Sequence, residues 1–213
     1  IDTYAAIRTI DQYFSGWKAR DLPKSRKWKE KKLSGREFVS VKYQAEEFVL
    51  LAFRTAKNSH RDADALLLMD MILDNATAGL INLNLNQMQK VRQAGSFPMQ
   101  HNDYGAQYFY GVPKEGQSLE EVEKLLLEQI ELVKQGEFED WILPAIINDF
   151  KKQRKAALES DSARVGLIMR AYIAREPWDR AVDQIRRMEK ITKTDIVRVA
   201  RRYFQGDYAA GYR

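Results

Sequence analysis

Residues 48–73 read FVLLAFRTAKNSHRDADALLLMDMIL, and they decide the fold class of this chain. The stretch opens with a continuous apolar run from Phe48 to Phe53, which is typical of a well-buried strand. A polar connection leads to Asp62 to Leu73, which is dense in Ala, Leu and Met and predicts a buried helix. A buried strand followed by a buried helix indicates a domain that combines sheet and helix.

On the upstream side the pattern predicts one helix and one further strand. Apolar residues spaced along Ile1 to Phe14 mark a helix face, and polar and apolar residues alternate from Glu37 to Tyr43. We expect the strand at Glu37 to Tyr43 to neighbour the more buried strand at Phe48 to Phe53. The segment Lys18 to Lys32 contains Pro23 and has no period, so it is expected to be a loop.

On the downstream side a second helix is expected from Gly79 to about Gln93. A β-hairpin follows, with strands at Gly95 to Gln100 and Ala106 to Val112 around the turn Asn102-Asp103-Tyr104-Gly105. Five helices and a final strand complete the pattern, at about residues 118–135, 140–158, 163–175, 178–188, 192–203 and 208–212.

Two of these helices carry the signature of a capping box, in which a hydroxyl and a carboxylate three residues later satisfy each other's backbone N–H groups. The pairs are Ser118 with Glu121 and Thr192 with Asp195. In the last helix the apolar residues share one face, whereas Arg198, Arg201 and Arg202 lie off it. No repeat, low-complexity tract or flexible linker is evident, so the pattern predicts one α+β domain over residues 1–213.

Composition narrows the function classes. Of the net charge of +5, the segment Lys18 to Lys32 alone carries +6, with eight basic residues against Asp21 and Glu30, so the other 198 residues sum to −1. The absence of cysteine excludes disulfides, thiolate metal sites and cysteine nucleophiles. No apolar run approaches the roughly 20 residues of a membrane span. The opening at Ile1 lacks a signal-peptide pattern, so we expect a piece of a longer chain with any targeting information upstream.

Candidate catalytic groups are few. The two histidines, His60 and His101, lie outside any His-x-x-His or His-x-x-Glu-His arrangement, and a zinc site needs at least three protein ligands. His60 precedes Asp62 and Asp64, where negative charge at a helix N-terminus is the simpler explanation. His101 falls in the predicted turn. We therefore predict no catalytic, cofactor-binding or metal-ligating residue in this chain.

The basic segment Lys18 to Lys32 is the one candidate for nucleic-acid binding, with Trp28 as a stacking platform. Against this hypothesis, the long helices lack a continuous basic stripe and the rest of the chain is nearly neutral. A solvated loop is the alternative.

The order of these elements resembles a known family. The stretch FVLLAFRTAKNSHRDADALLLMDMILDNATAGLINLNLNQMQKVRQAG is similar to the central part of a non-catalytic domain in the insulinase (pitrilysin-type) zinc peptidases. The closing segment Ile191 to Ile196, followed by Val199, Ala200 and Tyr203-Phe204, is similar as well. The resemblance covers nearly the whole chain.

The resemblance implies a mitochondrial-processing-peptidase-like metallohydrolase unit, in which helices cover one face of a mixed or antiparallel sheet. Four such units pair into two halves that close around an unfolded substrate. The inverted zinc motif lies in the first unit and is missing here, so zinc is expected only in the catalytic domain of the parent protein. The family's Arg and Tyr beside the active site would fall at Gln89 and Ser96, which do not fit, so no residue role is transferred.

The function implied is that of a non-catalytic domain of a zinc metalloendopeptidase, which forms part of the chamber wall and supports the zinc-bearing domain. The implied partners are the other domains or a partner subunit, and the peptide substrate in the chamber, without nucleic acid. Two alternatives stay open: a domain of an inactive homologue that scaffolds a catalytic subunit, and a basic module acting through Lys18 to Lys32. Many bacterial members of the family are exported, which makes the periplasm one candidate compartment.

Overall fold

The computed structural model describes residues 2–21, 23, 29–75 and 77–213. Its contacts divide the chain into two compact units, residues 1–32 and 33–213. The first unit contains helix α1 (Thr3–Phe14), whose N-terminus is capped by the side chain of Asp2. Its apolar residues, among them Ile7, Ile10 and Phe14, are about half exposed. The role of the basic segment Lys18 to Lys32 is untested, because Leu22 and residues 24–28, including Trp28, lie outside the described residues.

The second unit is built on a five-stranded mixed sheet in the order β1-β5-β2-β4-β3. The strands are β1 (Arg36–Ser40), β2 (Val49–Thr55), β3 (Gln93–Gln100), β4 (Gly105–Val112) and β5 (Tyr208–Tyr212). Strand β1 pairs in parallel with β5, and the other pairs are antiparallel.

The expectation that β1 and β2 are neighbours was wrong, because β5 lies between them and pairs with both. Alternation identifies a strand and its faces, but it does not identify the partner. The first strand also ends at Ser40, three residues earlier than predicted. The β3–β4 hairpin formed as expected, with Gln100 opposite Gly105 across the turn.

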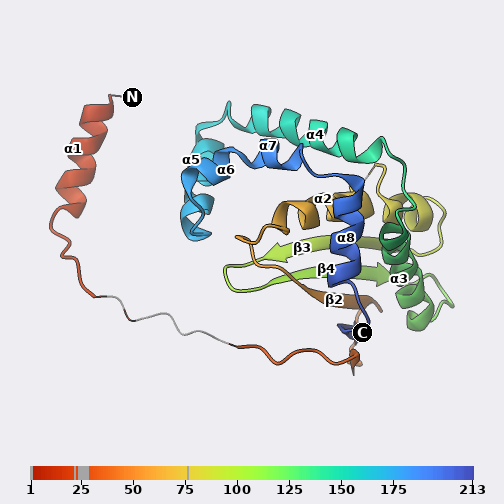
Figure 1. The fold of residues 1–213 in the computed structure, drawn as a ribbon. Helices are drawn as coiled ribbons and strands as arrows, with labels where there is room; N and C mark the ends of the chain where they lie inside the picture. The colour runs from red at the N-terminus through yellow and green to blue at the C-terminus, as the bar shows by residue number, and fades with distance from the viewer. Residues whose placement is uncertain (1, 22, 24–28, 76) are drawn as a thin grey trace. The chain divides into compact units, whose positions relative to one another are not determined.

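Helices pack on one face of this sheet (Figure 1). Those that contact its strands are α2 (Ala63–Leu73), α3 (Leu119–Gln135) and α8 (Lys193–Tyr203). Farther from the sheet, α4 (Ile142–Ala157) and α7 (Gln184–Met188) pack on α2, and α5 (Asp161–Ile173) and α6 (Trp178–Val182) connect them. Both capping boxes are present, at Ser118 on α3 and at Thr192 on α8. The α+β class and the helix-covered sheet are confirmed.

Two expected helices differ in detail. The helix expected from Gly79 to Gln93 is a short π-helical element, η1 (Asn82–Asn86), followed by turns. Asn86 explains its early end, because its side chain bonds both the N–H and the C=O of Ala94 and ties the chain into β3. The helix expected over 178–188 is divided into α6 and α7 at Asp183, a weak helix former.

The core lies between the sheet and the helices α2, α3 and α8. At its centre Phe53 packs against three rings, those of Phe109, Phe204 and Tyr208, with ring centroids 5.0–5.8 Å apart. Residues from β2, β4, β5 and the end of α8 therefore share one aromatic cluster, which fixes the sheet against the closing helix.

Candidate functional site

The face of the sheet opposite the helices is left open in the second unit. Along β2 the residues Val49, Leu51 and Phe53 are buried under the helices, and the alternate residues point to the other side. On that open face Phe97 and Met99 of β3 are each 41% exposed, and Val39 of the edge strand β1 is 64% exposed. Small and aromatic residues continue this face across the inner strands: Ala52, Ala106, Tyr108, Tyr110, Ala209 and Gly211.

The open face is mostly apolar, with Glu37 and Arg54 as its charged residues. The rings of Phe97 and Tyr108 stack on neighbouring strands, with centroids 5.2 Å apart and planes at 14°. Near the hairpin turn the guanidinium of Arg54 lies over the ring of Tyr104, 5.2 Å from its centroid. Such a surface suits contact with polypeptide, since it offers apolar area and backbone edges.

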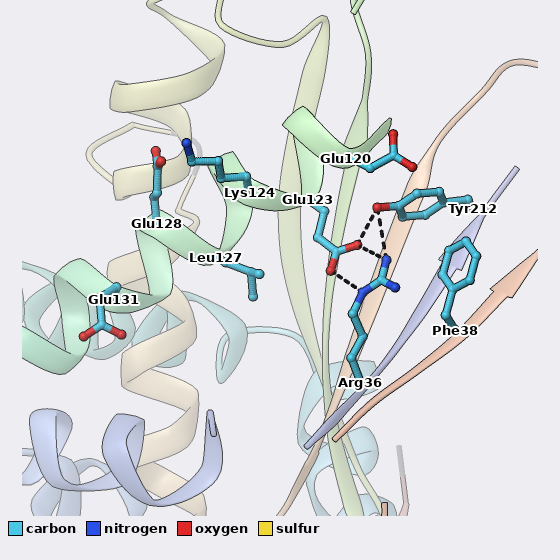
Figure 2. Close-up of a pocket in the computed structure, with 9 residues that line it drawn as sticks. All are labelled: Arg36, Phe38, Glu120, Glu123, Lys124, Leu127, Glu128, Glu131 and Tyr212. Atoms are coloured by element: carbon cyan, nitrogen blue, oxygen red, sulfur yellow. Dashed lines mark hydrogen bonds and ion pairs between the residues drawn. The ribbon is translucent and has the colours of Figure 1, made fainter. Parts of the chain in front are cut away.

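A groove of about 620 Å³ lies between α3 and the edge strand β1 (Figure 2). Arg36, Glu123 and Tyr212 converge in it from β1, α3 and β5. The Arg36 guanidinium binds Glu123 with two contacts of 2.7 Å, from Nε to Oε1 and from Nη2 to Oε2. Tyr208 and Tyr212 donate their hydroxyls to the same carboxylate at 2.7 and 2.6 Å.

These contacts satisfy the Glu123 carboxylate completely, because both of its oxygens accept two donors. Burial raises the pKa of Glu123, but the bonds from Arg36 and the two tyrosines outweigh burial and hold the pKa below its usual value. Burial and the same carboxylate raise the pKa of Tyr208 to about 12. The cluster therefore ties β1 and β5 to α3 and leaves no carboxylate lone pair for acid–base chemistry.

A second buried carboxylate, Asp70 of α2, faces β3 and β4. Its Oδ1 accepts from Ser96 Oγ at 2.6 Å and from Gln107 Nε2 at 2.5 Å, and Gln107 is 1% exposed. Burial raises the pKa of Asp70 to about 6, which the two hydrogen bonds oppose and the neighbouring carboxylate of Asp74 reinforces. Ser96 also donates its backbone N–H to Asp74.

The third cluster joins the start of α2 to α8. The carboxylate of Asp62, 1% exposed, accepts from Arg198 Nη2 at 3.0 Å and from the Tyr203 hydroxyl at 2.9 Å. Burial raises the pKa of Asp62, but these bonds outweigh burial and hold the pKa below its usual value. The arginines off the apolar face of the last helix thus have a structural task, which sequence reasoning missed because Asp62 is 136 residues away.

The positions singled out from the sequence do not gather into a site. Gln89 lies exposed in the turns after η1, with a φ of 52°, whereas Ser96 lies in β3 and is bonded to Asp70. His60 accepts the backbone N–H of Asp62 on Nδ1 at 3.1 Å, and His101 is exposed at the hairpin turn. In the described ranges, no group of three or more His, Cys, Asp or Glu residues could hold a metal ion.

Among the described residues, no helix is both long enough and apolar enough to cross a membrane.

The fold and these clusters define an α+β domain with an open sheet face, whose buried carboxylates serve its own packing. The family model of the peptidase M16 inactive domain matches residues 1–150. The chain therefore belongs to the peptidase M16 family, as its inactive domain, and the resemblance noted in the sequence is confirmed. No curated protein matches the sequence.

Solved structures share the fold. A protease from Helicobacter pylori is 22% identical, with a TM-score of 0.90 over all of this chain and 52% of that one. A peptidase M16 inactive domain from Pseudomonas fluorescens is 14% identical, with a TM-score of 0.77 over all of this chain and 50% of that one. The ferredoxin protease FusC, in complex with Arabidopsis ferredoxin, is 16% identical, with a TM-score of 0.67 over all of this chain and 25% of that one. The chain thus spans about half or less of these proteins.

Proposed function

We propose that this chain is the non-catalytic domain of a longer zinc metalloendopeptidase, in which it forms part of the substrate-chamber wall and supports a separate zinc-bearing domain. The observation that carries the proposal is the open sheet face, which is mostly apolar while the opposite face is packed with helices. Membership of the peptidase M16 family as the inactive domain supports it.

A chamber wall needs a surface that contacts unfolded polypeptide without binding one sequence tightly. The open face meets this need, because its apolar side chains contact substrate through nondirectional burial. The outer edges of β1 and β3, which each pair with one strand, add backbone groups to which an extended peptide can bond as a further strand. The likeness to a protease bound to a protein supports a polypeptide as the ligand of this face.

The catalytic zinc is assigned to another domain. In the part of the chain that the structure describes, Glu123, Asp70 and Asp62 are each held by hydrogen-bond donors of the same domain. We therefore expect residues 1–213 on their own neither to bind zinc tightly nor to cleave peptides. Stoichiometric zinc that survives brief chelation of the purified chain would refute this expectation.

The chamber role is tested on the full-length gene product with a charge placed on the open face. Phe97→Glu should lower kcat/KM for an unfolded protein substrate by about tenfold, equivalent to ~1.4 kcal/mol of lost contact. It should leave the zinc content and the cleavage of a short peptide unchanged. The matched control is Leu158→Glu, at a site of similar exposure (42%) at the end of α4, which should change neither rate.

Equal effects of the two variants on the protein substrate would exclude the open face as a chamber wall. A full-length product that lacks zinc, and cleaves only after a second subunit is added, would instead establish the scaffold of an inactive homologue.

A further inference from the structure

Helix α1 has an apolar face that the described residues of its own unit do not bury, although the ring of Trp17 contacts Phe14 edge-on at 4.9 Å between centroids. Tyr4, Ile7, Ile10 and Phe14 recur at helical spacing and are 49–75% exposed. Among the described residues, neither Arg8 nor Tyr13 has a side-chain partner, and Tyr13 is 71% exposed. An amphipathic helix of 12 residues is marginal in isolation, so its stability has to come from packing.

The sequence of α1 repeats that of α8 at a distance of 190 residues. Residues 2–16 read DTYAAIRTIDQYFSG and residues 192–206 read TKTDIVRVARRYFQG, so Arg, Tyr, Phe and Gly recur at the same offsets. Both helices start at a residue whose side chain accepts a backbone N–H, Asp2 in α1 and Thr192 in α8. The likeness ends at the glycine, because β5 begins two residues after Gly206 whereas the described residues between Gly16 and β1 (Arg36–Ser40) form no strand.

The contacts of α8 show what these shared residues do. Its apolar stripe is fully packed against α2, α3 and β2, with Ala200 and Phe204 at most 2% exposed. Arg198 and Tyr203 reach past this stripe to one buried carboxylate, Asp62, at the start of α2. The equivalent residues of α1 are Ile10 and Phe14 for the stripe, and Arg8 and Tyr13 for the carboxylate.

We propose that α1 is the closing helix of a preceding domain of this same fold in the same polypeptide, and that Arg8 and Tyr13 bind a buried carboxylate of that domain. Charge complementarity specifies the surface that binds α1. This surface is an apolar groove on a helix-covered sheet, with one acidic side chain at its end that plays the part of Asp62 in this domain. A Helicobacter pylori protease of this fold is nearly twice as long as the chain, which leaves room for such a domain. The inference does not depend on the chamber role, since it concerns only how α1 is held.

The test uses the full-length gene product, with amide hydrogen exchange and thermal unfolding as readouts. The amides of α1 should exchange at least about 100-fold more slowly there than in residues 1–213 alone. Ile10→Asp should abolish this protection, whereas Asp11→Asn should keep it, because Asp11 corresponds to Arg201, which is exposed on α8.

Arg8→Met tests the carboxylate. It should lower Tm at pH 7.5 and have less effect at pH 4, where protonation neutralises the unpaired acid. Arg198→Met supplies the reference, since it removes the arginine that binds the buried carboxylate of Asp62.

Three outcomes would overturn the proposal. If the α1 amides of the full-length product exchange without protection, then α1 is not docked on another domain. Protection that disappears on dilution would assign the face to a second copy. If the decrease in Tm caused by Arg8→Met is the same at pH 7.5 and pH 4, then Arg8 does not bind a buried carboxylate.

Discussion

Replacing Asp70 with Asn should stabilise this domain at neutral pH. Asp70 is 7% exposed, and no cation lies among its described partners, so ionisation is unfavourable in the folded state. Both hydrogen bonds reach Oδ1, and the amide oxygen of Asn can accept the same two donors, Ser96 Oγ and Gln107 Nε2. The substitution removes the buried charge and keeps the contacts.

The magnitude follows from the pKa. The pKa is 3.8 in the unfolded chain and about 6 in the folded one, a gap that corresponds to about 3 kcal/mol at ~1.4 kcal/mol per pH unit. Because the folded pKa is the higher one, the carboxyl favours folding fully only below pH 3.8, and this contribution is lost as the pH rises through 6. The advantage of Asn should therefore grow from about 0.5 kcal/mol at pH 4 to at most about 3 kcal/mol at pH 7.5.

The assay is urea unfolding of residues 1–213, as wild type and as Asp70→Asn, between pH 4 and pH 7.5. Asp103→Asn, in the exposed hairpin turn, is the control, and its difference from wild type should stay flat across this range. An advantage of Asp70→Asn that does not change with pH, or a variant less stable than wild type at pH 7.5, would refute the reasoning.

Three further predictions follow from the packing. Glu123→Gln should lower the free energy of unfolding in urea at pH 7 by about 1–3 kcal/mol, because Arg36 loses its charged partner. The control Glu120→Gln, at the exposed rim of the same groove, should change this free energy little. Gly105→Ala should lower Tm strongly and by more than Gly206→Ala, because a Cβ at Gly105 would overlap a backbone carbonyl whereas one at Gly206 meets open space; equal Tm values would contradict this. Thr192→Ala should lower the unfolding free energy by about 1 kcal/mol through loss of the capping box on α8, and unchanged urea midpoints would argue that the cap is dispensable.

Local chemistry explains what could be predicted from the sequence. The capping boxes at Ser118 and Thr192, and the hairpin expected around residues 102–105, depend on residues three to five positions apart, and each is present in the structure. The placement of β5 between β1 and β2 depends on pairing across more than 150 residues, which no local pattern specifies.

The same limit applies to the polar clusters. Asp62 and Asp64 read as charges at a helix start, and the structure shows both bound to arginines 136 and 123 residues away, Arg198 and Arg187. The one available signal was the set of arginines placed off the apolar face of a buried helix, where a cation needs a nearby acid. The sequence contains both halves of the pair but not their contact.

The position of β5 in the sheet also limits how much of the sheet can form while the protein is being synthesised. As the chain leaves the ribosome, β1 and β2 emerge about 160 residues before the strand that joins them, and β1 pairs with no other described strand. The β2–β4–β3 meander can form early, whereas β1 waits with an unpaired backbone until Tyr208 to Tyr212 appears. During that interval two adjacent edges are open to wrong partners. A nascent chain stalled before residue 208 should therefore stay bound to ribosome-associated chaperones longer than the finished chain does.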